Sequence, residues 1–301
     1  MNVAICGLGK MGMNLVLNLM DHGHKVVAYD INDKLVEEAE ARGATGARTL
    51  EEVVNNLPDK KVIWMMVPAG DITEQLVTAI EPHLSPGDVL MDGGNAFYKD
   101  SMRRHEKLKA LGIHYIDVGT SGGMEGAREG ACTMVGGDKE AVSEVEQIFK
   151  DVSVTNGYLY TGRSGSGHFL KMVHNGVEYG MMQAIGEGFD ILEKSAFDYD
   201  HEKVARVWNN GSVIRSWLME LIETAFSEDP KLDDIKGIVH ASGEGRWTVE
   251  TAMELETSAP VIALSLMMRN RSLENDTFSG KVVASLRNQF GGHSVELKDS
   301  K

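Results

Sequence analysis

The sequence predicts an α/β fold in which a doubly wound sheet is followed by an all-α C-terminal domain. One observation is that short β-rich runs alternate with amphipathic stretches from residue 2 to residue 150, as in successive βαβ units. Another is that a glycine turn directly follows the first of these runs. From residue 166 the pattern changes to one helix after another. We therefore expect two domains, at residues 1–162 and 163–301, which suits a chain of 301 residues.

The expected strands of the first domain are apolar and β-branched runs, and turn residues separate them from the expected helices. The strands are Asn2–Cys6, Lys25–Tyr29, Lys61–Val67, Asp88–Met91, Ile113–Val118 and Cys132–Val135. The helices are Met11–Asp21, Lys34–Ala41, Ile72–Ile80, Asp100–Ala110 and Lys139–Lys150, and strand 132–135 with helix 139–150 is expected to close the sheet. In the second domain a long helix follows the small-residue segment 161–167, and breaks are expected near residues 198–200, 229–230 and 243–245.

The charge balance argues against a nucleic-acid partner. Thirty basic and 45 acidic side chains give a formal net charge of −15, so the field of the protein repels polyanions and an anionic ligand must be captured locally. The longest apolar runs, 62–69 and 259–268, are too short to span a membrane. The N-terminus lacks the basic region and the long apolar segment of a signal peptide. We expect a cytoplasmic protein with no membrane partner.

The cysteines and histidines do not form a pattern typical of a metal site. Cys6 and Cys132 lie far apart in the sequence, which disfavours a disulfide framework and a thiolate site and fits a reducing compartment. No HExxH motif occurs, and His22-Gly-His24 is interpreted as a solvated turn. No metal is expected.

The first candidate site is the turn Gly7-Leu8-Gly9-Lys10-Met11-Gly12. It follows a predicted strand and opens a predicted helix, which is the context that makes a GxGxxG motif typical of a Rossmann-type dinucleotide-binding domain. Gly7 permits the tight turn, Gly9 lets the backbone approach a pyrophosphate, and Gly12 lets the helix pack on the strand. The helix N-terminus supplies oriented N–H groups for the phosphates. The alternative is a glycine-rich surface turn.

Asp30 ends the second expected strand, at the distance from Gly12 where an acidic residue bonds the adenosine ribose hydroxyls. The extra phosphate of NADP would bring about two negative charges to this carboxylate, with no arginine nearby to offset them. We therefore expect NAD rather than NADP, with Lys34 as the one cation close by. The alternative is that Asp30 caps the helix entered through Asn32 and Asp33.

Four polar side chains share one face of the long expected helix. At about 100° per residue, the positions relative to Lys171 are about −60° for His174, +40° for Asn175 and −20° for Glu178. The rest of the helix is apolar, and buried polar groups in a row are costly unless they face a wet cleft or a polar ligand. The alternative is an ion pair between Lys171 and Glu178. However, about 10 Å of helix separates these two residues, which suits gripping a small molecule between them.

These motifs belong to a larger set by which the chain resembles the decarboxylating 6-phosphogluconate dehydrogenases, in the short NAD-type form with a single helical domain. The resemblance extends over nearly the whole chain. The segments that carry it are Gly7 to Gly12, Asp92 to Asp100, Ser121 to Arg128, Lys171 to Tyr179, Gly243 to Thr248 and Arg287 to His293. It implies that residues 1–162 bind the dinucleotide and that residues 163–301 bind the substrate and form a dimer.

The resemblance implies oxidative decarboxylation of 6-phospho-D-gluconate to D-ribulose 5-phosphate and CO2 with reduction of NAD, a reaction of the pentose phosphate pathway and of gluconate utilization. Lys171 would take the proton of the 3-hydroxyl while hydride leaves C3, and would return a proton to the enolate oxygen after CO2 is lost. Glu178 would then protonate C1 of the enediol. A lysine base needs a lowered pKa, which burial and a cationic neighbour provide.

The resemblance also supplies the candidate binding residues. The cofactor-binding set is Gly7, Leu8, Gly9, Lys10, Met11, Gly12, Asp30, Val67, Pro68 and Asn95. The substrate-binding set is Asn95, Ser121, Gly122, Gly123, Lys171, His174, Asn175, Glu178, Tyr179, Arg271, Arg287 and His293. Asn95, Ser121 and Gly123 would contact the substrate carboxylate and the nicotinamide side. Tyr179 and Arg271 would reach toward the 6-phosphate.

The chain departs from the family pattern in two places. Longer members carry Lys-Gly-Thr-Gly-Lys-Trp-Thr where this chain has Ser242-Gly-Glu244-Gly-Arg246-Trp-Thr, which removes an expected phosphate-binding lysine. NADP-type members carry Asn-Arg-Thr after the second strand where this chain has Asp30-Ile-Asn32, which supports NAD.

The C-terminal segment of the family comes from the neighbouring subunit. Arg287, Phe290 and His293 resemble that segment, and a guanidinium with an imidazole suits a phosphate dianion. We expect a homodimer or a homotetramer with shared active sites. The alternative is a frayed polar tail.

Two other functions are open. A 3-hydroxyisobutyrate-type β-hydroxyacid dehydrogenase also has a glycine turn of this kind and the pair Lys171 and Asn175, but it needs neither Glu178 nor a phosphate clamp. A non-catalytic dinucleotide sensor would keep the fold without needing Lys171 and Glu178.

Overall fold

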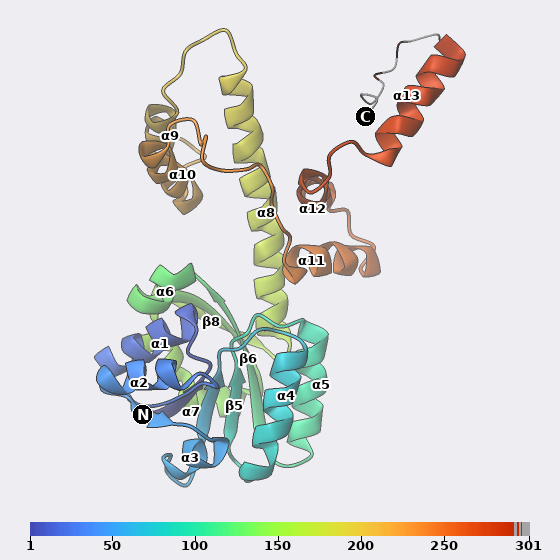
Figure 1. The fold of residues 1–301 in the computed structure, drawn as a ribbon. Helices are drawn as coiled ribbons and strands as arrows, with labels where there is room; N and C mark the ends of the chain where they lie inside the picture. Colours follow the sequence, from blue (N-terminus) through green and yellow to red (C-terminus); the bar gives the residue numbers. More distant parts are fainter. Residues whose placement is uncertain (292–293, 295, 297–301) are drawn as a thin grey trace. The chain divides into compact units, whose positions relative to one another are not determined.

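The computed structural model describes residues 1–291, 294 and 296, and the chain divides into two compact units (Figure 1). The first unit comprises residues 1–175 and the second comprises residues 176–301. The division falls inside one long helix, α8 (Ser166–Glu193), so each unit contains part of this helix. The predicted domain boundary after residue 162 lies just ahead of α8 and stays a prediction.

The first unit is a mostly parallel sheet with helices on both faces, which confirms the predicted fold class (Figure 1). The strands are β1 (Asn2–Cys6), β2 (Lys25–Tyr29), β3 (Thr45–Ala47), β4 (Val62–Met65), β5 (Val89–Asp92), β6 (His114–Ser121), β7 (Ala131–Gly136) and β8 (Ser153–Gly162). Their order across the sheet is β3-β2-β1-β4-β5-β6-β7-β8. Only β6 and β7 pair antiparallel. Residues 122–130 connect them, fewer than the dozen or so that a crossover to a parallel strand needs.

The helices of this unit are α1 (Lys10–Asp21), α2 (Asp33–Ala41), α3 (Leu50–Asn55), α4 (Asp71–Ile80), the 3₁₀ turn η1 (Glu81–His83), α5 (Tyr98–Lys109), α6 (Gly123–Glu129) and α7 (Lys139–Asp151). The prediction that helix 139–150 closes the sheet is wrong, because β8 follows α7 and forms the edge. In the sequence, Asn156-Gly157 in the first part of β8 is typical of a turn, and in the structure the pairing of this part with β7 is irregular. That irregularity hides the strand from a search for periodicity.

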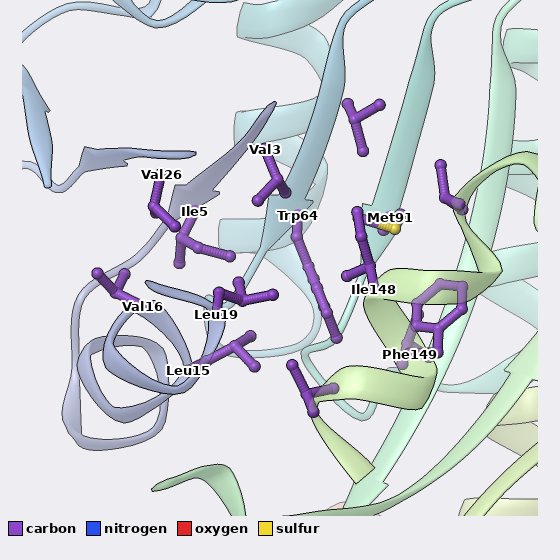
Figure 2. Close-up of a cluster of buried hydrophobic side chains, with 14 of the residues drawn as sticks. Val3, Ile5, Leu15, Val16, Leu19, Val26, Trp64, Met91, Ile148 and Phe149 are labelled. Atoms are coloured by element: carbon purple, nitrogen blue, oxygen red, sulfur yellow. The ribbon is translucent and has the colours of Figure 1, made fainter. Parts of the chain in front are cut away.

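Successive residues of the central strands supply two separate cores. Val3 and Ile5 of β1 pack on one face of the sheet with α1, α2 and α7. Ala4 and Cys6 pack on the other face with α3, α4 and α5. Alternate side chains of a strand point to opposite faces, and a sheet covered on both faces needs nearly continuous apolar strands. Figure 2 shows part of the first core, where Trp64 is only 1% exposed.

A buried carboxylate attaches the start of α8 to the sheet. Asp117 of β6 is fully buried, and it accepts the backbone N–H of Gly165 at 2.6 Å and that of His168 at 2.9 Å. An anion at a helix N-terminus is stabilised by the N–H groups that lack a partner within the helix and by the helix dipole. A Cβ on Gly119 would lie 2.4 Å from the Cβ of Lys171, so the helix packs directly on the strand backbone. The sheet thus fixes the first turns of α8.

The second unit is entirely helical after its part of α8, as the sequence predicts. Its other helices are α9 (His201–Asn209), α10 (Trp217–Glu228), α11 (Gly243–Glu254), α12 (Pro260–Ser272) and α13 (Phe278–Gly291). The expected break at residues 243–245 is wrong, because these residues form the first turn of α11, whose N-cap is Ser242. Glycine is least costly at a helix end, which explains why the pattern reads as a break.

The turn at His22 and His24 is not the solvated turn that we predicted. His24 is 6% exposed, and its Nε2 lies 2.8 Å from a carboxylate oxygen of Asp151. Among the described residues, no group of three or more His, Cys, Asp and Glu side chains gathers closely enough to hold a metal ion. No helix within the described part of the chain is both long enough and apolar enough to cross a membrane.

Candidate active site

The glycine turn between β1 and α1 has the geometry of a phosphate-binding loop. Gly7 has φ +104°, and a Cβ there would lie 2.5 Å from the Met66 carbonyl oxygen. A Cβ on Gly12 would lie 1.9 Å from the Gly7 carbonyl oxygen, whereas no atom lies within 4 Å of a Cβ on Gly9. Gly9 is the N-cap of α1 and makes no side-chain cap, so the helix start is open to an anion. Gly7 and Gly12 are thus required by close packing, whereas Gly9 leaves the backbone at the start of α1 open.

Asp30 lies against this turn rather than capping α2. Its Oδ2 accepts the backbone N–H of Leu8 at 2.7 Å, and its Oδ1 accepts that of Asn32 at 2.9 Å. The N-cap of α2 is Asn32, whose side chain accepts the N–H of Lys34. The alternative that Asp30 caps the helix is therefore wrong. Burial and the neighbouring Asp30 carboxylate raise the pKa of the Cys6 thiol to about 12, so this thiol stays neutral near pH 7.

The loops after β4 and β5 lie at the same edge of the sheet as the glycine turn. β1, β4 and β5 are parallel neighbours, so the loops that follow them emerge side by side. A side-chain carbon of Val67 lies 3.0 Å from the position of a Cβ on Gly7. Asn95 has φ +51°, and its Oδ1 accepts the N–H of Thr120 at 3.2 Å. The predicted residues Val67, Pro68 and Asn95 are thus brought to one edge.

Lys171, His174 and Ser121 form a polar cluster within the first unit. Lys171 is 5% exposed, and its Nζ lies 3.5 Å from Nδ1 of His174. The same ring nitrogen lies 2.9 Å from Oδ1 of Asn175, and Nε2 lies 3.2 Å from Oγ of Ser121. The amide oxygen of Asn175 can only accept, so Nδ1 carries the hydrogen and donates to it, and Nε2 accepts from the Ser121 hydroxyl. His174 thus connects the end of β6 to Asn175 beside the buried amine.

Ser121 is placed by the turn from β6 into α6. Gly122 and Gly123 follow it with φ +120° and +60°, values that glycine adopts without strain. No atom lies within 4 Å of a Cβ on Gly123, so the start of α6 presents open backbone beside the cluster. This geometry is consistent with the predicted binding role of the Ser-Gly-Gly segment, which stays a prediction.

Tyr179 is the centre of a second cluster, which lies in the helical unit. It is 4% exposed, and its hydroxyl accepts the N–H of Ser242 at 2.9 Å and lies 2.9 Å from the Ser242 hydroxyl. The guanidinium carbon of Arg269 lies 3.4 Å from the centre of its ring, a cation–π contact. A Cβ on Gly245 would lie 2.3 Å from a ring carbon, so α11 approaches the tyrosine closely.

Arg269, which lies over the Tyr179 ring, is not among the residues predicted from the sequence, and the predicted phosphate role of Arg271 stays a prediction. Arg271 donates through Nη1 to the carbonyl oxygen of Glu274 at the end of α12. Two residues along a helix differ by about 200°, so only one of these arginines can face the tyrosine. Helical periodicity could not choose between them, because α12 carries apolar residues on every side.

The remaining predicted residues are spread over the described chain. Glu178 lies on α8 and is partly buried, and Arg287 lies on α13 and is exposed. His293 lies outside the described residues. The binding and catalytic roles of all these residues stay predictions.

Two sequence profiles together account for nearly the whole chain. The NAD binding domain of 6-phosphogluconate dehydrogenase matches residues 2–162, and the C-terminal domain of 6-phosphogluconate dehydrogenase matches residues 167–289. The chain belongs to the 6-phosphogluconate dehydrogenase family. The glycine turn falls within the first match, and the polar face of α8 falls within the second.

Three similar proteins agree with this membership. The Bacillus subtilis protein YqeC, provisionally named a 6-phosphogluconate dehydrogenase, is 60% identical, and the match covers 99% of this chain and 100% of YqeC. The NAD(+)-dependent, decarboxylating 6-phosphogluconate dehydrogenase of Haloferax volcanii is 45% identical, with 99% and 100% covered. The structure of Plasmodium falciparum 6-phosphogluconate dehydrogenase, studied with NADP+ and 6-phosphogluconate, has a TM-score of 0.84 at 31% identity, with 100% of this chain and 67% of that chain covered.

Replacing Gly9 with alanine should separate cofactor binding from folding. The backbone there (φ −59°, ψ −175°) suits alanine and the Cβ position is open, so the melting temperature should change by less than about 2 °C. The methyl group would occupy the face offered to a pyrophosphate, so the Kd for NAD should rise at least about tenfold. Calorimetric titration checks this, and tight binding by Gly9→Ala would contradict the assignment.

Gly12→Ala is the matched control. Its methyl group meets the Gly7 carbonyl oxygen, so we expect the free energy of unfolding to fall by about 2 kcal/mol or more.

Proposed function

We propose that this chain is an NAD-dependent, decarboxylating 6-phosphogluconate dehydrogenase that converts 6-phospho-D-gluconate to D-ribulose 5-phosphate and CO2. The observation that carries the proposal is the buried Lys171 beside His174 and Ser121, in the same unit as an open glycine turn. The Haloferax relative carries this activity in its name. The open face at Gly9 and the carboxylate of Asp30 fit a dinucleotide.

The chain's own residues perform the proton transfers. Bound at the glycine turn, a nicotinamide dinucleotide would supply the acceptor for the hydride of C3. Lys171, in its neutral form, takes the proton of the 3-hydroxyl, and a 3-keto acid results. The C1–C2 bond then breaks and releases CO2, and the ammonium of Lys171 returns its proton to the enolate oxygen. Glu178 protonates the carbon that becomes C1 of ribulose 5-phosphate, while the enol O–H on the neighbouring carbon gives its proton back to Lys171. His174 and Asn175 hold the reacting hydroxyls.

The buried position of Lys171 supports its role as a base. Burial disfavours the ammonium form, and a lysine must lose its proton near neutral pH to abstract one. Glu178 follows seven residues later on the same helix, and we assign it the role of the second acid.

The phosphate end of the substrate is assigned to Tyr179, Arg271, Arg287 and His293. Arg269 joins this set, because the structure places its guanidinium over the tyrosine ring. Ser242 stands where longer family members carry lysine, and its bonds to the Tyr179 hydroxyl fix the tyrosine without adding a charge. Arg269 compensates for the missing cation.

The helical unit supports the proposal that the protein is a homo-oligomer. Its buried apolar cluster consists of four residues, Phe189, Ala205, Met219 and Phe226. By contrast, α12 and α13 expose large apolar side chains at helical spacing, among them Val261, Leu264, Phe278, Val282 and Leu286. Exposed apolar faces of this kind are typical of subunit interfaces. In a dimer or tetramer, Arg287 and His293 of one chain complete the site of another.

A 3-hydroxyisobutyrate-type dehydrogenase is the second candidate, since it shares the glycine turn, Lys171 and Asn175. Glu178 and the arginine over Tyr179 favour the proposed function, because a simple hydroxyacid oxidation needs neither a second acid nor a phosphate site. Incubation with NAD and 6-phosphogluconate should release one CO2 for each NADH formed. NADH without CO2 would favour the second candidate, and neither product would favour a dinucleotide sensor.

Preference for NAD over NADP follows from the position of Asp30. The 2′-phosphate of NADP would approach a carboxylate that is already bonded to the glycine turn, so we expect at least about tenfold higher kcat/KM with NAD, or about 1.4 kcal/mol. Asp30→Asn should narrow this preference, while Asp33→Asn on α2, with the same change of charge, should not. Equal kcat/KM values of the wild-type protein with NAD and NADP would contradict the prediction.

Separate variants should divide the reaction into its steps. Lys171→Met should abolish hydride transfer, because no base takes the 3-hydroxyl proton. Glu178→Gln should slow the final protonation more than cofactor reduction. Glu187→Gln, an exposed change on the same helix, is the control and should leave both steps unchanged. Single-turnover measurements of NADH and ribulose 5-phosphate check this, and the reverse order of effects would overturn the two roles.

Shared active sites can be tested by mixing two inactive chains. Lys171→Met lacks the base, and Arg287→Ala lacks the arginine of the C-terminal segment. In a heterodimer of the two, one site combines the intact Lys171 of one chain with the intact Arg287 of the other, so part of the wild-type activity should return. Exchange of subunits is followed with differently tagged chains. If exchange occurs and no activity returns, the sites are not shared.

A further inference from the structure

A buried arginine connects the two loops that follow β4 and β5. Arg104 lies on α5 and is 1% exposed. Its Nη1 donates to Oδ2 of Asp92 at 3.3 Å, and its Nε donates to Oε2 of Glu74 at 3.0 Å. Its Nη2 donates to the carbonyl oxygen of Gly70 at 3.5 Å. Gly70 ends the loop after β4, and Asp92 is the last residue of β5. One guanidinium therefore bonds to both connections and to α4.

Asp92 holds the turn that leads to Asn95. Its Oδ1 accepts the N–H of Gly94 at 3.0 Å, and its Oδ2 accepts the hydroxyl of Tyr115 at 2.6 Å in addition to Arg104. Asn95 follows in the left-handed region, and its side chain is bonded to the backbone of β6. Hydrogen bonds thus fix the backbone on both sides of this turn.

The two loops also touch each other. A Cβ on Gly94 would lie 2.4 Å from the carbonyl oxygen of Val67, so glycine is required where the loops meet. The hydroxyl of Thr73 donates to the carbonyl oxygen of Pro68 at 2.9 Å, which fastens the same loop to α4. A shift of either loop therefore displaces the other.

The hydrogen bonds around Arg104 depend on the planar geometry of its guanidinium as well as on its charge. Burying a guanidinium and a carboxylate carries a large desolvation penalty, and apolar residues of similar volume would stabilise the fold as well. Burial and the Asp92 carboxylate hold the pKa of Tyr115 well above its usual value, so the hydroxyl stays a donor. Hydrogen bonds from Arg103 and, to a smaller extent, Arg104 lower the pKa of Glu74 to about 2, so this carboxylate stays an acceptor. A planar fork with several fixed donors meets these partners at once, and a lysine cannot.

We propose that Arg104 is a positioning residue for the nicotinamide half of the cofactor site. In a doubly wound sheet a dinucleotide lies across the switch point between β1 and β4, with its adenosine half toward β2 and its other half toward β5. The loops that Arg104 joins follow β4 and β5, on the side of the nicotinamide half of the dinucleotide. They carry Val67, Pro68 and Asn95. The inference rests on the proposed function in one respect, that a nicotinamide dinucleotide binds at this edge. It does not depend on the sugar acid.

Comparison of NAD with ADP-ribose tests this role, because ADP-ribose keeps the adenosine half and both phosphates but lacks nicotinamide. For Arg104→Lys, which keeps the charge and loses the fork, the ratio of the NAD Kd to the ADP-ribose Kd should rise at least about fivefold in calorimetric titrations. Single-turnover hydride transfer should slow at least about tenfold, since the reacting carbon is misplaced.

Arg103→Lys is the matched control. Arg103 precedes Arg104 on α5 and bonds Glu74 at 2.8 Å, but it is half exposed and pairs with Glu74 and Asp100 at the surface. This variant should leave the Kd ratio and the rate of hydride transfer within about twofold of the wild-type values.

Tyr115→Phe is the second variant, because it removes one hydrogen bond to Asp92 without changing a charge, and it decides the question if Arg104→Lys does not fold. It should raise the Kd ratio at least about twofold. Equal weakening of both ligands would assign Arg104 a general structural role and overturn the proposal, as would unchanged binding. If the wild-type protein binds NAD but releases no CO2 from 6-phosphogluconate, the proposed function fails while the two-ligand comparison still decides the role of Arg104.

Discussion

The attachment of α8 to the sheet is the constraint on which the polar cluster of the first unit depends. Asp117 accepts two N–H groups at the start of this helix, and Lys171 follows about one turn after the second of them. A carboxylate buried in this way is stabilised by the helix start itself, since the N–H groups and the helix dipole supply partial positive charge. A side chain at Gly119 would push the helix away from the strand at Lys171. The position of the lysine is therefore set by backbone contacts, which vary less than contacts between flexible side chains.

Parallel pairing explains why residues far apart in the sequence meet at one edge. β1, β4, β5 and β6 are consecutive neighbours and run in the same direction, so the segments that follow them all emerge at the carboxyl edge. The glycine turn begins directly after β1, Val67 and Asn95 lie within three residues of the ends of β4 and β5, and Ser121 is the last residue of β6. Asn95 and His174 are then bonded to the end of β6, which joins the cofactor loops to the start of α8. Strand order alone assembles most of this unit's candidate site.

The sequence predicts the features that leave a local pattern and misses those that depend on tertiary contact. Strands covered on both faces and amphipathic helices give clear periodicity, and their ends fall within a few residues of the structure. β3 is too short for a pattern, and β8 is interrupted by an irregular pairing. The glycine turn and Asp30 carry a motif. Asp117, Arg104 and Arg269 carry none, because what distinguishes them is a partner far away in the sequence.

The two units differ in how their stability arises, and this difference bears on how the proposed active site is built. The first unit has two large apolar cores, one on each face of its sheet, and it holds the glycine turn, the loops after β4 and β5, and Lys171. The helical unit has a four-residue buried cluster and wide exposed apolar faces, and it carries Tyr179, Arg269 and Arg287. Chemistry that needs accurately placed reacting atoms suits the rigid unit, since small displacements there are costly. Recognition of a phosphate by long cationic side chains tolerates more movement. Under the proposed function, an association of chains that buries these apolar faces would also position Tyr179, Arg269 and Arg287 for the phosphate. Substrate recognition would then depend on the oligomer, whereas Lys171 is held by the contacts of the first unit alone.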